Sequence, residues 1–130
     1  MHKPMKSLLA ICVLAAAGAA FAQEQVVNLY SARHYATDEA LYSGFTKATG
    51  IKVNRVDSDD AGIMARLKAE GTASPADVIL LVDAARLYRG EADGRFLPVR
   101  SKVLEDAIPA NLRATPAADG GIAWFGLSTR

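Results

Sequence analysis

An unbroken aliphatic run from Val78 to Val82 is the feature that most restricts how this 130-residue chain can fold. A strand carries aliphatic side chains on both faces when both faces are covered. Asp77 precedes the run and Asp83 follows it, at places where a carboxylate caps a helix or accepts hydrogen bonds from nearby backbone amides. We therefore predict a buried central strand of a parallel sheet over residues 77–82, with both aspartates in structural roles.

Two earlier β-prone runs, at residues 26–30 and 51–56, are separated by the pattern of a helix. Thr37 is placed to cap this helix, and Gly50 is placed to end it. Its apolar side chains recur at helical spacing, so we expect one packed apolar face. That face consists of Leu41, Phe45 and Ala48.

A second helix is expected to begin at Asp59 or Asp60 and to end at Gly71. The acidic group that contains Asp57 lacks the full spacing of a calcium-binding loop, so we assign it to capping and solvation. The apolar stripe of this helix is more typical of a core than of a ligand site. It consists of Ile63, Met64 and Leu67.

A third helix is expected after Asp83, closed by the turn at residues 93–94. Three arginines lie in this helix and the turn after it, and we interpret them as solvated charges. They are Arg86, Arg89 and Arg95.

Trp124, near the end of the chain, is expected in the core or at the edge of a cleft.

Strands and helices therefore alternate along the chain, which is the pattern of an α/β fold with a mostly parallel sheet and right-handed crossovers. In such open sheets, ligands bind at the carboxyl ends of the strands, near the point where the strand order reverses. The loop at residues 32–36 follows the first predicted strand and is the predicted ligand site.

His34 and Tyr35 are the candidate metal ligands in this loop. Ferric iron is a hard, highly charged ion that prefers anionic oxygen donors, and a nearby cation favours the deprotonated phenolate of a tyrosine. A neutral imidazole adds a borderline nitrogen donor. The alternative interpretation is a surface His-Tyr pair that contacts only its neighbours or water.

The first 22 residues have the features of a cleaved signal peptide: lysines at the start, then an apolar stretch, then small residues before a cut after Ala22. The apolar stretch is shorter than the roughly 18 residues that a membrane span needs. Cys12, the only cysteine, leaves with the signal, so disulfides and thiolate chemistry are excluded. We expect a periplasmic chain over residues 23–130, without membrane insertion after cleavage.

Several classes of function are not supported by the sequence. It contains no Gly-x-Ser-x-Gly elbow, no dinucleotide fingerprint, no phosphate loop and no His-Glu-x-x-His motif. The 15 basic residues nearly balance the 14 acidic ones, so nothing indicates nucleic-acid binding. We therefore do not expect an enzyme.

The chain also resembles the bacterial periplasmic ferric-iron-binding proteins, which are the substrate-binding components of Fe(3+) ABC transporters. Six segments in order support this resemblance along residues 25–130. They are Leu29–Tyr35, Thr49–Val53, Ser74–Val78, Val82–Ala84, Ile108–Leu112 and Trp124–Ser128.

This resemblance implies a type II periplasmic-binding-protein fold, of which residues 23–130 form part of the N-terminal lobe. It also implies that His34 and Tyr35 bind ferric iron, alone or with a companion anion, in a monomer that delivers the iron to an inner-membrane permease. Val82 stands where some relatives have a glutamate, which points to the tyrosine-rich subgroup, whose further tyrosines lie beyond the end of this chain. Arg130 falls near a basic position of the family.

Two alternatives remain at this point. One is a binding protein of the same fold for a small organic or inorganic anion or a polyamine. The other is a secreted hydrolase whose catalytic residues lie beyond Arg130. The last segment reads as the start of another element, so we expect that the chain is truncated before the second lobe is complete.

Overall fold

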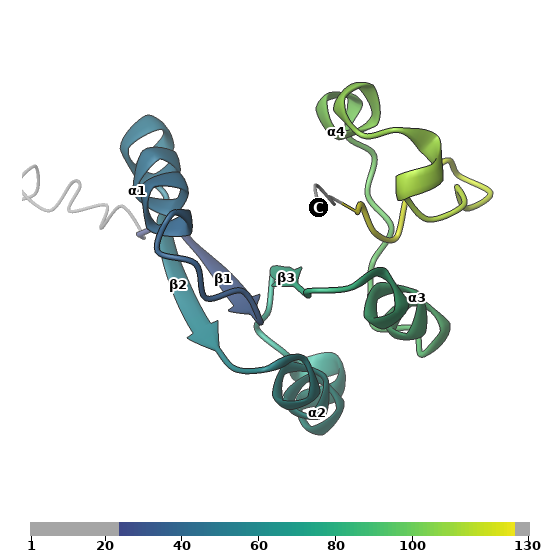
Figure 1. Cartoon of the computed structure of the whole chain (residues 1–130), viewed down its shortest axis with the longest axis horizontal. Helices are drawn as coiled ribbons and strands as arrows, with labels where there is room; N and C mark the ends of the chain where they lie inside the picture. The colour runs from purple at the N-terminus through teal and green to yellow at the C-terminus, as the bar shows by residue number, and fades with distance from the viewer. Residues whose placement is uncertain (1–23, 127–130) are drawn as a thin grey trace, which may run out of the picture.

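A computed structural model describes residues 24–126 of the chain. The predicted signal peptide at residues 1–22 and Arg130 lie outside the described residues. The described elements form a β/α alternation followed by short helices (Figure 1). They are β1 (Val26–Ser31), α1 (Asp38–Thr49), β2 (Lys52–Asp57), α2 (Asp60–Glu70), η1 (Gly71–Ala73), β3 (Val78–Leu80), α3 (Ala84–Ala92), α4 (Lys102–Ala107) and η2 (Ala110–Leu112).

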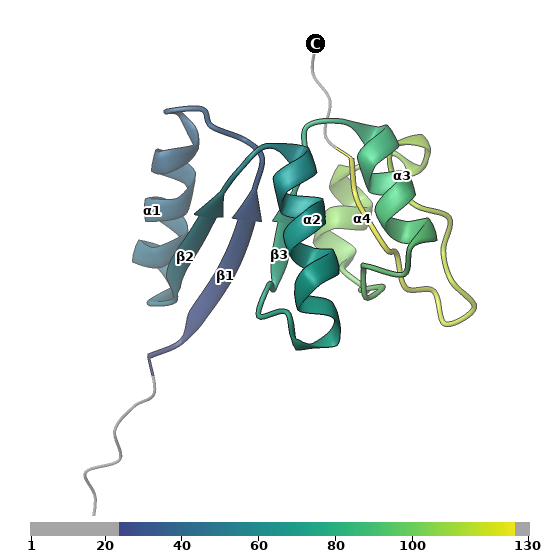
Figure 2. The same cartoon turned by 90° about the horizontal axis from the view of Figure 1, so that it is seen from below.

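The three strands form one parallel sheet in the order β2-β1-β3, so that β1 is central among the described strands. Leu29 of β1 pairs with Arg55 of β2 on one side and with Val78 of β3 on the other. Figure 2 shows the strands running in the same direction with helices beside them. The α/β fold with a parallel sheet and flanking helices, predicted from the sequence, is confirmed.

The prediction of a buried central strand over residues 77–82 was wrong in two respects. The strand is parallel, but it covers only Val78–Leu80 and lies at the edge of the described sheet. Val78 is 43% exposed and Val82 is 58% exposed. The reason is that an aliphatic run permits burial on both faces, whereas burial itself requires neighbouring elements, and no described strand pairs with the outer edge of β3.

Helix α1 begins and ends where the sequence predicted, but its apolar face is not packed. Thr37 occupies the N-cap position without a side-chain capping hydrogen bond, and Gly50 ends the helix in the left-handed conformation with φ 74°. Leu41 is 68% exposed, Phe45 is 39% exposed, and α1 contains no buried residue. The expected packed face was therefore wrong for the described residues, and Figure 1 shows β2 as the described element that lies beside α1.

Helix α2 supplies the packed stripe that the sequence predicted. Asp59 caps it by accepting a hydrogen bond from the Gly62 amide at 2.7 Å, which settles the choice between the two candidate aspartates. Ile63 and Leu67 are buried against Tyr30 of the central strand. These contacts form the core that holds the end of β1 in place.

A polar network closes this core at the surface. The Tyr30 hydroxyl, on a ring that is almost fully buried, donates to the Glu70 carboxylate at 2.9 Å and 3.0 Å. Ser74 donates to the same carboxylate at 2.7 Å, and so does Arg66 at 2.7 Å. A buried hydroxyl needs such a partner, so Glu70 compensates the burial of the Tyr30 hydroxyl.

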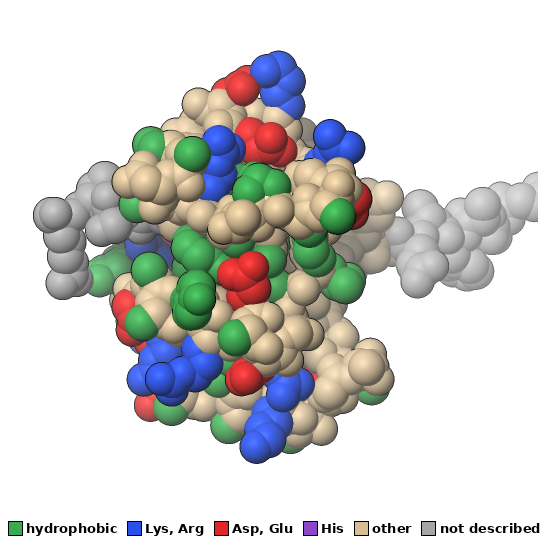
Figure 3. Space-filling model, turned by 90° about the vertical axis from the view of Figure 1, so that its right-hand side faces the viewer, with side chains coloured by type: hydrophobic (Ala, Val, Ile, Leu, Met, Phe, Trp, Pro, Cys, Tyr) green, Lys and Arg blue, Asp and Glu red, His purple; other side chains and the backbone are tan. Residues whose placement is uncertain are grey.

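The segment after β3 packs more openly. Antiparallel bridges join Val99 to Ile122 and Arg113 to Phe125. Ile108 and Ala114 are buried there together with Ile122. Figure 3 nevertheless shows hydrophobic side chains gathered at the surface of one face, between groups of charged side chains. Within residues 24–126, no helix is long and apolar enough to cross a membrane.

Candidate functional site

The loop that carries both predicted metal ligands lies at the carboxyl end of the central strand. Strand β1 ends at Ser31, which is fully buried. The Ser31 hydroxyl accepts a hydrogen bond from the Arg33 amide at 3.0 Å and donates to the Arg33 carbonyl at 3.1 Å. The Ala32 amide donates to the Leu80 carbonyl at 2.8 Å, which extends the pairing with β3. These hydrogen bonds fix the start of the loop, which lies at the carboxyl end of β1 as the sequence predicted.

His34 reaches from this loop to the next one. Its Nε2 lies 3.1 Å from the carbonyl oxygen of Ser58, the residue that follows β2. A carbonyl oxygen only accepts hydrogen bonds, so Nε2 carries the proton in this arrangement. In the neutral ring the lone pair is then on Nδ1, and an imidazole whose other nitrogen is held by a carbonyl is the usual form of a metal-binding histidine.

Tyr35 is 48% exposed, and the Arg33 guanidinium carbon lies 4.8 Å from the centroid of its ring. Arg33 is itself held by Asp38, at the start of α1, through two hydrogen bonds of 3.0 Å and 3.1 Å. This pairing lowers the pKa of the Asp38 carboxyl and raises the pKa of the Arg33 guanidinium. The Asp38 carboxylate thus holds the Arg33 guanidinium over the face of the Tyr35 ring.

The acidic residues of this region have the structural roles predicted for them. Asp57 pairs with Arg55 at 2.8 Å, and the Asp60 carboxylate accepts from the Val82 amide at 3.2 Å. Asp77 accepts from the Asn28 amide at 2.8 Å, and Asp83 caps α3 by accepting from the Arg86 amide at 2.8 Å. Among residues 24–126, no three His, Cys, Asp or Glu side chains are grouped so that they could hold a metal ion.

Sequence reasoning missed three groups that shape the loop, namely the Ser31 hydroxyl, the Ser58 carbonyl and the Arg33–Asp38 pair. The parallel register places Ser31 opposite Asp57, so the residue after Asp57 necessarily lies near the residues after Ser31. Parallel pairing of the two predicted strands was therefore the signal that could have placed Ser58 near this loop.

Trp124 does lie at the edge of a cleft, where its Nε1 donates to Glu91 at 2.7 Å.

Comparison with protein-family models finds no match. Iron uptake protein A1 of Synechocystis sp. is 50% identical over 108 residues, which are 83% of this chain and 29% of that protein. The Fe(3+)-binding periplasmic protein of Serratia marcescens is 40% identical over 91 residues, which are 63% of this chain and 27% of that protein. A solved structure of the Trichodesmium protein IdiA (FutA) in complex with iron and citrate matches with a TM-score of 0.70 at 48% identity, covering 79% of this chain and 31% of that one.

The parallel sheet, together with the solved structures that it matches, places the described residues in an α/β lobe of the periplasmic-binding-protein class. Within that class, the chain is homologous to the bacterial periplasmic ferric-iron-binding proteins. The resemblance inferred from the sequence is thereby confirmed. The chain spans about three tenths of the length of the relatives that it matches.

Proposed function

We propose that this chain takes part in the capture of ferric iron in the periplasm, with His34 and Tyr35 as its contribution to the coordination sphere. The observation that carries the proposal is the position of these two adjacent side chains on the loop that follows the central strand, with the imidazole oriented by the Ser58 carbonyl. The names of the relatives, which refer to iron uptake and ferric iron, support the choice of metal.

The chemistry of the loop suits a trivalent cation. The phenolate of Tyr35 would supply the anionic oxygen that ferric iron prefers, and Nδ1 of His34 would supply a neutral nitrogen. Binding through Nδ1 keeps the hydrogen bond to Ser58, whereas binding through Nε2 breaks it. Two protein ligands do not fill the coordination sphere of iron, so further donors or a companion anion would complete it. Citrate accompanies iron in the Trichodesmium structure.

The same proposal includes export and delivery. Residues 1–22 would act as a signal peptide, and residues 23–130 would form part of the N-terminal lobe of a monomeric binding protein that passes iron to an inner-membrane ABC permease. In such proteins a metal favours the closed state through ligands drawn from both lobes. The Serratia relative, which is named as periplasmic, supports this location. The relatives reported above are named for uptake or binding and not for a reaction, so we propose no enzymatic activity.

The alternative ligand, a small organic or inorganic anion or a polyamine, is not favoured. A polyamine would be recognised by a cluster of carboxylates that have no other partner. The described aspartates near the loop instead cap a helix, pair with an arginine or accept a hydrogen bond from a backbone amide. The iron named for the relatives also weighs against it.

Ferric nitrilotriacetate is a suitable probe, because the chelate leaves part of the coordination sphere open for the protein. We expect a visible charge-transfer band when it is added to the 130-residue chain, and loss of that band in Tyr35→Phe. Tyr88→Phe is the matched control, because Tyr88 is an exposed tyrosine on α3, outside this loop. A chain that gives no band, or a band of equal strength in Tyr35→Phe, would overturn the assignment.

A further inference from the structure

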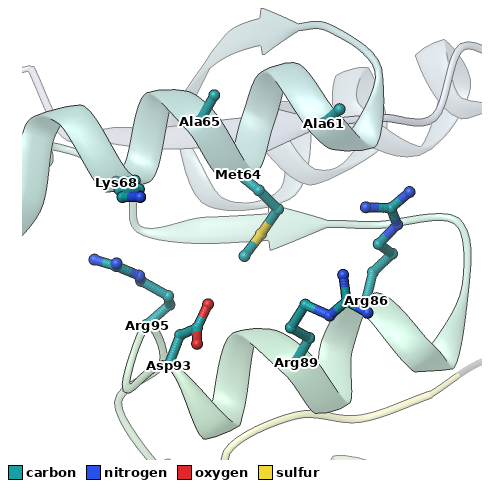
Figure 4. A pocket seen from close by; sticks show the side chains of 8 residues that line it. All are labelled: Ala61, Met64, Ala65, Lys68, Arg86, Arg89, Asp93 and Arg95. Atoms are coloured by element: carbon teal, nitrogen blue, oxygen red, sulfur yellow. The ribbon is translucent and has the colours of Figure 1, made fainter.

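A cleft of about 290 Å³ lies between α2 and α3, and four of the side chains that line it are cationic (Figure 4). Lys68 comes from α2, Arg86 and Arg89 come from α3, and Arg95 comes from the segment after α3. Asp93 is the one acidic residue among the described residues that line the cleft. The cleft is therefore a concentrated region of positive charge on a chain whose total charge is close to zero.

Most of this charge has no partner within the described part of the chain. Between residues 24 and 126, no ion pair involves Lys68, Arg89 or Arg95. Arg86 has only a long contact of 3.9 Å with Asp83. Like charges held close together repel one another, and an anion bound between them removes that repulsion.

The interaction of cations with helix dipoles accounts for only part of the cluster. Lys68 and Arg89 lie in the last turns of their helices, where a positive charge is favourable without any ligand. Arg86, however, lies in the first turn of α3, where the helix dipole disfavours a cation, and Arg95 lies outside the helix. The helix dipoles therefore favour only two of the four cations, and Asp83 lies 3.9 Å from Arg86.

The cations stand at two ends of the cleft with an apolar side chain between them. Figure 4 shows Arg86 and Arg89 at one end and Lys68 and Arg95 at the other, with the Asp93 carboxylate beside Arg95 and the side chain of Met64 directed into the space between. A planar guanidinium donates two parallel hydrogen bonds to a carboxylate or a phosphate. The arrangement suits a short molecule with an anionic group at each end.

We propose that this cleft binds a small polyanion that carries carboxylate or phosphate groups at both ends. Its volume of about 290 Å³ is just below the range of about 300 to 1,000 Å³ that is typical of small-molecule sites. The lining residues include none from the loop of His34 and Tyr35, so the site is separate from the proposed metal ligands. Sequence reasoning had assigned the arginines to solvated charge, because it had no means of placing α2 next to α3.

Isothermal titration calorimetry of the metal-free 130-residue chain tests the proposal, with tricarballylate as the carboxylate probe and inorganic pyrophosphate as the phosphate probe. We expect at least one of them to bind, and the affinity to fall at least tenfold in Arg89→Gln/Arg95→Gln. Lys47→Gln/Arg100→Gln is the matched control, because it removes the same charge from exposed positions outside the cleft and should bind like the unchanged chain.

Which probe binds then identifies the preferred anionic group. Failure of both probes to bind the unchanged chain would overturn the proposal, and so would equal losses in the two double variants. If circular dichroism shows that the arginine variant is unfolded, Ala65→Glu replaces it. This change puts a carboxylate into the cleft from the exposed side of α2 and should abolish binding, whereas undiminished binding would contradict the site. Because no iron is present, these results are independent of the proposed iron capture.

Discussion

Nε2 of His34 lies 3.1 Å from the carbonyl oxygen of Ser58, and this hydrogen bond joins the loop after β1 to the loop after β2. Removing it in His34→Ala should loosen the loop, because one hydrogen bond contributes about 1 kcal/mol. We expect the hydrogen-bonded amides of Ala32 and Arg33 to exchange hydrogen about fivefold faster, measured by mass spectrometry, since 1.4 kcal/mol corresponds to a factor of about ten. His34→Gln, which keeps a donor, should restore part of the protection. Equal exchange rates in His34→Ala and the unchanged chain would show that the bond does not hold the loop.

Asp38 should affect metal binding without being a ligand. It holds the Arg33 guanidinium through two hydrogen bonds, and that guanidinium lies over the Tyr35 ring. In Asp38→Asn we expect the affinity for ferric nitrilotriacetate to fall about tenfold, as when an outer partner of a metal ligand is lost. Asp106→Asn, which breaks the exposed pair with Lys102, should leave the affinity unchanged. Equal affinities in the two variants would mean that Arg33 does not position Tyr35.

The core under the loop can be tested with two aliphatic side chains of very different burial. Ile63 is 0% exposed and packs in the cluster with Tyr30, whereas Leu41 is 68% exposed on α1. Ile63→Ala should lower the free energy of unfolding by about 2–5 kcal/mol, because it removes buried groups and leaves a cavity. Leu41→Ala should change it by no more than about 0.5 kcal/mol. Urea denaturation followed by circular dichroism measures both, and a large loss in Leu41→Ala would show that α1 has a covered face in solution.

Glu70 should make stability depend on acidity. Hydrogen bonds from Ser74, Arg66 and Tyr30 hold the pKa of its carboxyl below the ordinary value of 4.5. A carboxyl whose pKa is lower in the folded state stabilises the fold above its unfolded pKa, and this contribution is lost as the pH falls through the folded pKa. We therefore expect melting temperatures to fall as the pH is lowered below about 4.5, with a shallower fall in Glu70→Gln. If melting temperature fell with pH equally in Glu70→Gln and in the unchanged chain, a group other than Glu70 would be responsible for the acid sensitivity.

Much of the candidate site was accessible to sequence reasoning. The β-prone run at residues 26–30, the loop after it and the helix from Asp38 to Thr49 appear where they were predicted. These features depend on local rules, because periodicity selects helix or strand and a glycine with positive φ ends a helix. The hydrogen bond that orients His34 was not predicted, because its partner is the backbone carbonyl of Ser58, and every residue type has such a carbonyl.

The sequence by itself determined the type and order of the elements, the parallel α/β class and the two adjacent candidate ligands, since each depends on residues close together in the chain. The tertiary structure alone decided that β1 rather than β3 is central, that the apolar face of α1 is exposed, and that Arg86, Arg89 and Arg95 share a cleft with Lys68. The physical reason is that burial and charge clustering depend on contacts between segments distant in sequence, which no local pattern specifies.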